Sequence, residues 1–63
     1  MTFDEWQKGD RSLSDLRGLH RREEDFDHGI RLGVLYDMIK SGRPQRNIDR
    51  QIALIQECYS LKR

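Results

Sequence analysis

Apolar residues recur with a helical period along the last third of the chain. One row recurs at i, i+4, i+7 and i+11, and a second row lies beside it at i, i+4 and i+7. The first row comprises Ile48, Ile52, Ile55 and Tyr59, and the second comprises Leu54, Cys58 and Leu61. Two adjacent apolar rows suit a helix that touches two others, as in a helical bundle. The pattern predicts a helix over residues 44–61, with Ile52 at the centre of its buried stripe.

A second amphipathic segment precedes this helix. Its apolar side chains fall within one arc of about 160° on a helix of about 100° per residue. They are Leu32, Val34, Leu35, Met38 and Ile39, and Phe26 and Ile30 widen the arc on one side. Gly42 tolerates the left-handed backbone that closes helices, and Pro44 suits the first turn of the next helix. We therefore predict an antiparallel helical hairpin with arms at residues 24–41 and 44–61.

The first 22 residues predict a separate helical segment. Thr2 and Glu5 have the spacing of a capping box, in which a Thr caps a helix and a Glu three residues later caps it in return. The helix that starts there carries Phe3 and Trp6. We expect these two aromatic side chains to fold back on the hairpin, and the alternative is that they anchor the chain in a partner's groove. The predicted fold is all-α, with residues 1–63 as one small domain.

The stretch that joins this segment to the hairpin is ambiguous. Either Ser12 or Ser14 can cap a second short helix. Residues 20–27 are nearly all charged, which fits either a solvated helix or a hinge. Gly29 and Gly33 lie on the polar side of the first hairpin arm, where they leave a shallow groove. Either the groove receives another helix, for which the N-terminal one is a candidate, or the glycines only lower helix propensity.

Length and cysteine content favour self-association in a reducing compartment. A chain of 63 residues buries only about 60% of the surface that its unfolded form exposes, and small domains often oligomerise to compensate. One cysteine permits no internal disulfide, which fits the cytoplasm. No apolar run approaches the roughly 20 residues of a membrane span, and the first residues lack a secretory signal. We expect a soluble cytoplasmic protein that forms a homodimeric helical bundle and does not enter membranes.

The net charge of +1 conceals an asymmetry along the chain. Residues 1–39 carry six Lys or Arg and nine Asp or Glu, a balance of −3, whereas residues 40–63 carry six and two, a balance of +4. Charge matching between arms or subunits explains this pattern, and an acidic partner is the alternative. Arg43, Arg46 and Arg50 are the candidates for nucleic-acid contact, because arginines bind phosphates and base edges. Their row is diluted by acidic residues, and the whole chain is not strongly basic.

Candidate metal ligands and nucleophiles do not form a complete site. His20, Glu24 and His28 recur every four residues, but the outer pair lies about 12 Å apart along a helix and cannot share one ion. The spacing of Asp25 and His28 suits a di-iron bundle, which needs further inward carboxylates. Cys58 has no activating base beside it in the sequence, and its place in an apolar row favours a buried thiol. We predict no metal, no cofactor and no catalytic residues.

The predicted function is binding. We expect a small, non-enzymatic regulatory or adaptor protein that acts through helix-mediated protein–protein contacts. Phage and mobile-element accessory genes commonly encode proteins of this size without site chemistry, so this is the expected class of origin. The predicted protein-binding and oligomer residues are Ile48, Ile52, Ile55, Tyr59, Leu54, Cys58, Leu61, Phe3 and Trp6. The alternative is a small nucleic-acid-binding transcriptional regulator that uses the arginine row.

Overall fold

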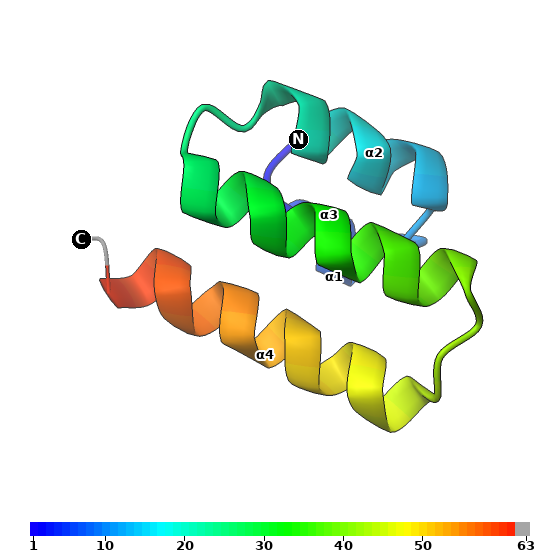
Figure 1. Cartoon of the computed structure of the whole chain (residues 1–63). Coiled ribbons are helices and arrows are strands. Elements are labelled where there is room, and N and C mark those ends of the chain that lie inside the picture. Colours follow the sequence, from blue (N-terminus) through cyan, green and yellow to red (C-terminus); the bar gives the residue numbers. More distant parts are fainter. Residues whose placement is uncertain (62–63) are drawn as a thin grey trace.

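Residues 1–61 are described by a computed structural model of the protein, and residues 62–63 of the predicted domain lie outside this range. The described residues form four helices and no strand: α1 (Phe3–Lys8), α2 (Leu13–Arg22), α3 (Phe26–Lys40) and α4 (Gln45–Leu61) (Figure 1). The predicted all-α class is confirmed for this part of the chain. Among its helices, none has the length and hydropathy that a bilayer span needs.

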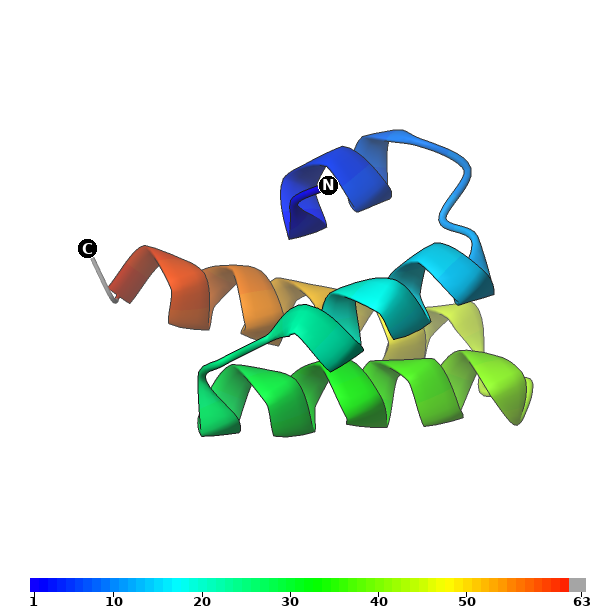
Figure 2. The same ribbon diagram turned by 90° about the horizontal axis from the view of Figure 1, so that it is seen from above.

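The helices are arranged around a single core. α3 and α4 run antiparallel as a hairpin, and α2 packs along α3 (Figure 1). α1 lies over the gap between α2 and α4, on the side opposite α3 (Figure 2). All four helices contribute to the core, which comprises Phe3, Trp6, Leu16, Leu32, Leu35, Ile52 and Ile55. The prediction that the N-terminal aromatic side chains fold back on the hairpin is confirmed.

The first helix is fixed at both ends by local hydrogen bonds. The predicted capping box is present: the Glu5 N–H donates to Thr2 Oγ1, and the Thr2 N–H donates to Glu5 Oε1, each at 3.2 Å. The Trp6 ring stacks on Phe3 with centroids 5.6 Å apart. Its Nε1–H donates to the Ser12 carbonyl at 2.8 Å. The tryptophan therefore holds α1 to the start of α2.

The charged stretch at residues 20–27 is a link between helices and not a continuous helix. α2 ends at Arg22, and the Asp25 side chain accepts a hydrogen bond from the His28 N–H at 3.1 Å. Aspartate in this position caps a new helix, because its side chain satisfies one of the first free N–H groups. The first hairpin arm therefore begins at Phe26 and not at residue 24.

The hairpin turn follows the sequence signals closely. Gly42 has a φ of 75°, in the left-handed region that glycine adopts without strain. The Arg43 N–H donates to the Met38 carbonyl at 3.0 Å and the Gly42 N–H to the Ile39 carbonyl at 3.1 Å, which is the Schellman pattern. The Pro44 carbonyl accepts from Ile48 at 3.2 Å, so the second arm begins at Gln45, one residue after its predicted start.

α2 packs against α3 at Gly33, in agreement with the prediction that another helix occupies the groove left by the glycines of α3. A Cβ atom at Gly33 would lie 3.0 Å from Cε1 of His20 on α2, closer than side chains normally approach. A Cβ atom at Gly29 would lie 3.9 Å from the Glu23 side chain. The absence of a side chain at Gly33 therefore leaves room for His20 of α2, whereas the distance at Gly29 is an ordinary contact.

Alanine substitutions at two other glycines should change the stability of the fold in opposite directions. Gly18 lies inside α2 and a Cβ there would meet nothing within 4 Å, so Gly18→Ala should stabilise the fold by about 1 kcal/mol through helix propensity. Gly42→Ala should destabilise it by about 1–2 kcal/mol, because alanine resists a positive φ. Thermal unfolding followed by circular dichroism should show shifts of about 4–8 °C per kcal/mol, upward for the first and downward for the second. Equal shifts in one direction would contradict the two backbone assignments.

Candidate protein-binding surface

Large apolar side chains remain exposed on one side of the hairpin. Among the described residues, those on α3 and α4 retain between 43% and 79% of their accessible surface. They are Phe26, Ile30 and Val34 on α3 and Leu54 and Leu61 on α4. Together with the half-buried Cys58, they are called the outer face below. Outside this face, the terminal Met1 completes the set of exposed large hydrophobic residues in the described chain.

Contacts between the two helices place these residues side by side. Gln51 Nε2 donates to the Arg31 carbonyl at 3.1 Å, and further along the hairpin the rings of His28 and Tyr59 lie 4.0 Å apart. In an antiparallel pair, residues between these two contacts are level with one another. Ile30 on α3 is therefore level with the turn of α4 that carries Leu54.

The same contacts show which side of α4 borders α3. Gln51, Leu54 and Cys58 recur at i, i+3 and i+7, so they lie on one side of α4. Gln51 contacts α3, so Leu54 and Cys58 also flank the groove between the two helices. On α3, Val34 lies one turn before Met38, which shares a hollow with residues of α4. The outer face thus follows the α3–α4 groove on its solvent side.

Charges are divided between the two ends of the outer face. At the turn end the exposed residues are basic, namely Lys40, Arg43, Arg46 and Arg50. Toward the other end, the exposed charged residues of the described hairpin and of the α2–α3 link are acidic, namely Glu24, Asp27 and Glu57, while the exposed Arg21 and Arg22 lie beside them at the end of α2. Asp37 and Asp49 are the acidic residues near the basic end, and Asp49 is engaged by Gln45 at 2.8 Å and by Arg11 at 4.0 Å. Within the described residues of α3 and α4, the face therefore has an apolar centre with mainly basic residues at the turn end and acidic residues at the other end.

A small hollow lies at the basic end of the outer face. It has a volume of about 340 Å³ and is lined by Met38, Arg43, Asn47, Arg50 and Gln51. The hollow brings Arg43 and Arg50 together, whereas Arg46 does not line it. The three predicted nucleic-acid residues thus do not share one concave site, although all three are exposed.

The predicted binding residues divide between the core and this face. Phe3, Trp6, Ile52 and Ile55 are buried within the chain, and Ile48 and Tyr59 pack partly against the same core. These six side chains stabilise the fold and present little surface to a partner. The second predicted row, Leu54, Cys58 and Leu61, lies on the outer face instead.

The outer-facing residues of α3 differ from the prediction. Val34 and Leu35 belong to the same predicted apolar arc, but Val34 is exposed and Leu35 is fully buried. The core-facing stripe of α3 is His28, Leu32, Leu35 and Ile39, at i, i+4, i+7 and i+11; the first three are buried and Ile39 is partly buried. The same periodicity that marked α4 would have found this stripe if His28 had been counted with the apolar residues.

No family model, curated protein or solved structure matches this chain. Its function is therefore inferred from the geometry of its own surface.

A polar network closes the end of the bundle away from the hairpin turn. The Tyr59 hydroxyl donates to Glu23 Oε2 at 2.7 Å, and Glu23 Oε1 accepts from the Asp25 N–H at 3.0 Å. The buried His28 ring lies against Tyr59, and its Nδ1 is 4.0 Å from Asp25 Oδ1. These contacts join the α2–α3 link to the last turns of α4.

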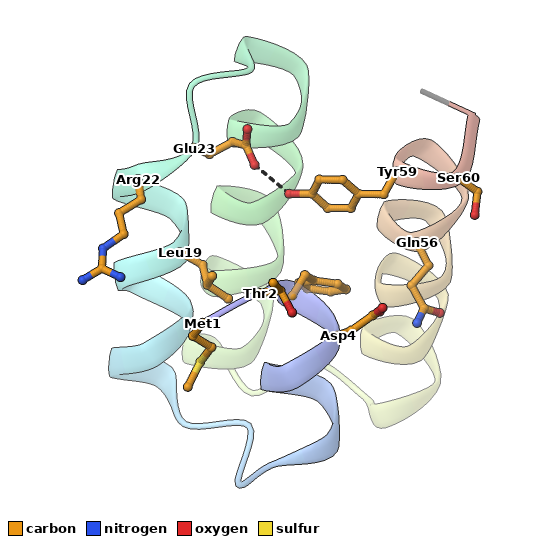
Figure 3. A pocket seen from close by; sticks show the side chains of 10 residues that line it. Met1, Thr2, Asp4, Leu19, Arg22, Glu23, Gln56, Tyr59 and Ser60 are labelled. Atoms are coloured by element: carbon orange, nitrogen blue, oxygen red, sulfur yellow. Dashed lines mark hydrogen bonds between the residues drawn. The ribbon is translucent and has the colours of Figure 1, made fainter. Parts of the chain in front are cut away.

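An open groove of about 800 Å³ lies beside this network, between α1, α2 and α4 (Figure 3). α1 has six residues, which span about 9 Å at 1.5 Å per residue, so it covers only part of the gap between the longer helices. The groove is bordered by Phe3, Leu19, Glu23 and Tyr59. Tyr59 borders this groove, and its hydroxyl donates a hydrogen bond to Glu23 (Figure 3).

The candidate metal ligands do not come together in this fold. Their predicted common side required one straight helix, but the helix is interrupted between Arg22 and Phe26. His20 is exposed on α2, Glu24 lies in the link and His28 is buried on α3. Within residues 1–61, no three His, Cys, Asp or Glu side chains are grouped to hold a metal ion.

The environment of Tyr59 should make the fold less stable at alkaline pH. Burial, together with the hydrogen bond to Glu23 and the charge of that carboxylate, raises the pKa of the Tyr59 phenol well above its ordinary value of about 10. Above about pH 10 the unfolded chain releases this proton while the folded chain keeps it, so the free energy of unfolding should fall as pH rises further. Below that pH the contribution of Tyr59 should not vary.

The phenolate absorbance of Tyr36→Phe protein reports on Tyr59, because the chain has two tyrosines. We expect ionisation to occur later in the folded than in the denatured protein. In Tyr59→Phe protein the additional alkaline destabilisation should disappear. Coincident titrations of the folded and denatured states would contradict the Tyr59–Glu23 contact.

Proposed function

We propose that this chain is a small, non-enzymatic regulatory or adaptor protein that binds another protein molecule through the outer face. The observation that carries the proposal is the collection of exposed apolar side chains along one helix pair. Contiguous apolar patches are uncommon on monomers and typically mark interaction surfaces. A lone thiol suits the cytoplasm as the compartment of this binding.

The geometry also fits a helix-based mode of recognition. Val34 on α3 and Leu54 on α4 are exposed beside the α3–α4 groove, and Ile30 is exposed one turn before Val34. An amphipathic helix or helix pair docks in such a groove with its own i, i+3, i+4 and i+7 side chains. The charged ends of the face would then fix the orientation of the partner, since electrostatic complementarity contributes mostly to specificity.

A capture experiment with matched variants tests this proposal. Tagged wild-type protein and the variants Ile30→Glu and Leu54→Glu should be expressed in the native cells, and co-purifying proteins quantified by mass spectrometry. Each substitution places a carboxylate in the apolar centre, where a partner would have to desolvate it. We expect wild-type protein to retain a partner in near-stoichiometric amount and both variants to lose it.

Ser14→Glu on α2 is the matched control, because it adds the same charge at an exposed site away from the outer face. It should capture as the wild type does. All variants should keep the helical circular dichroism of the wild type, since the changed residues are exposed. Capture that is unchanged in both outer-face variants would overturn the proposal.

A nucleic-acid-binding regulator is the second candidate, favoured by the hollow that joins Arg43, Asn47 and Arg50. Arginine and amide side chains in one concavity suit a phosphate and the adjacent base edge. In a gel-shift assay, binding by this surface would fall steeply with salt because counterions are released. The triple substitution of Arg43, Arg46 and Arg50 by Ala would abolish it. We rank this candidate second because Asp49 lies within the arginine row and the net charge of the chain is only +1.

A further inference from the structure

We infer that the partner of the outer face is a second copy of this chain, placed antiparallel on it with the two-fold axis near Leu54. The inference rests on the proposed function, since it names the occupant of the same face. It is carried by the distribution of charged, small and apolar residues along the exposed side of α4.

The charge polarity of the face is self-complementary. A two-fold axis that lies in the plane of the interface, perpendicular to α4, reverses the direction of the second copy, so each end meets the opposite end. The basic end, with Arg43 and Arg50, then lies near the acidic end of the other copy, with Asp27 and Glu57. A parallel arrangement would instead place like charges together, which is unfavourable.

The exposed row of α4 gives the register of this pairing. Arg50 and Glu57 are seven residues apart, and the midpoint between them lies between Ala53 and Leu54. Each charged residue is therefore about 5 Å from this midpoint along the helix axis. An axis at the midpoint sets Arg50 of each copy opposite Glu57 of the other, so the pair forms twice. The small side chain of Ala53 lets the two helices approach closely at the centre.

The same register places an exposed leucine at the hollow. Leu61 is among the most exposed apolar residues of the described chain. With the axis near Leu54, Leu61 of one copy is level with Arg46 of the other, at the hollow that includes Met38 and Asn47. The hollow, with a volume of about 340 Å³, has room for a leucine side chain. In the dimer, Leu61 of each copy would thus be buried in the hollow of the other copy, and this contact would form twice.

The area available agrees with a small dimer. A standard interface buries about 800 Å² on each partner. The accessible surface of the chain is 4712 Å², so this corresponds to about a sixth of the total. The exposed side of two helices provides an area of this order, because α4 alone, with 17 residues, is about 25 Å long.

Size-exclusion chromatography with light scattering tests the association. At tens of micromolar, under reducing conditions that exclude a Cys58 disulfide, wild-type protein should have twice the mass of one chain. Leu54→Glu protein should be monomeric and should keep its helical circular dichroism. A monomeric wild type would overturn the inference, whereas the proposed function would stand if the capture experiment still depended on the outer face.

Charge exchange tests the register. Arg50→Glu and Glu57→Arg should each weaken self-association by at least about tenfold, because each creates two like-charge contacts in place of two attractive pairs. Arg17→Glu, at an exposed site on α2, is the control for the change in net charge and should dimerise as the wild type does.

The decisive sample is an equimolar mixture of the two single variants. A chain with Glu at both positions and a chain with Arg at both positions form two attractive pairs with each other. The mixture should therefore yield a heterodimer at concentrations where each variant alone is mainly monomeric, and the double variant Arg50→Glu/Glu57→Arg should regain the wild-type dimer. A mixture that associates no better than its components would overturn the proposed register.

Discussion

Replacing Trp6 with Ala is expected to remove most of the stability of this protein. The Trp6 side chain is only 1% exposed, and it stacks on Phe3 while its Nε1–H donates to the Ser12 carbonyl. Deleting a buried tryptophan typically costs about 3–5 kcal/mol. At about 0.05–0.15 kcal/mol per residue, a domain of this size has roughly 3–9 kcal/mol in total. Urea denaturation followed by circular dichroism at low micromolar concentration measures the loss.

Trp6→Phe separates the two contributions of the tryptophan. Phenylalanine keeps an aromatic ring in the core but cannot donate to the Ser12 carbonyl. We expect it to cost about 1–3 kcal/mol, through the lost hydrogen bond and the smaller ring. If Trp6→Ala unfolded at the wild-type urea concentration, α1 would not be docked between α2 and α4.

Ile52→Ala should have the second largest effect. Ile52 is 4% exposed and lies mid-way along α4, where it belongs to the core formed by all four helices. Removing a buried isoleucine side chain to Ala costs about 2–5 kcal/mol, through lost burial and the cavity left behind. The urea midpoint should fall while the denaturant dependence stays unchanged, since the surface exposed on unfolding changes little.

Ile30→Ala provides the matched control for Ile52→Ala. It makes the same chemical change inside a helix, but Ile30 is 49% exposed on the outer face. At concentrations low enough to suppress association, its effect should be within about 0.5 kcal/mol of zero, as at most surface sites. Equal destabilisation by the two variants would mean that the two sides of the hairpin are equally buried.

The outer face shows how far the site was predictable. The double apolar row on α4 indicated a helix with two neighbours, and in the described chain its second row, Leu54, Cys58 and Leu61, lies on the outer face. The α3 half of the face was not predicted. Phe26 and Ile30 are predicted only as a widening of the apolar arc on one side, and both are exposed. A pattern of apolar residues gives the width of a face but not which part of it a neighbour will cover.

The sequence by itself determined the local structure of this protein. The Thr2–Glu5 capping box and the Ser41–Gly42 turn form where their residues predict. These features depend on hydrogen bonds between groups three to five residues apart and on the backbone preference of glycine, so they need no distant partner. The helical stripe with Ile52 at its centre is equally local, because it follows from the period of the helix.

Only the tertiary structure decided which side of α3 is buried and where α1 docks. The apolar arc of α3 is wide enough to be covered from more than one direction, and apolar burial is non-directional. The choice follows from α2, which lies against Gly33 through His20 and leaves His28 facing the core. It follows also from the Tyr59–Glu23 hydrogen bond, whose residues are 36 positions apart. Such contacts depend on the simultaneous packing of all four helices, which no single helical period encodes.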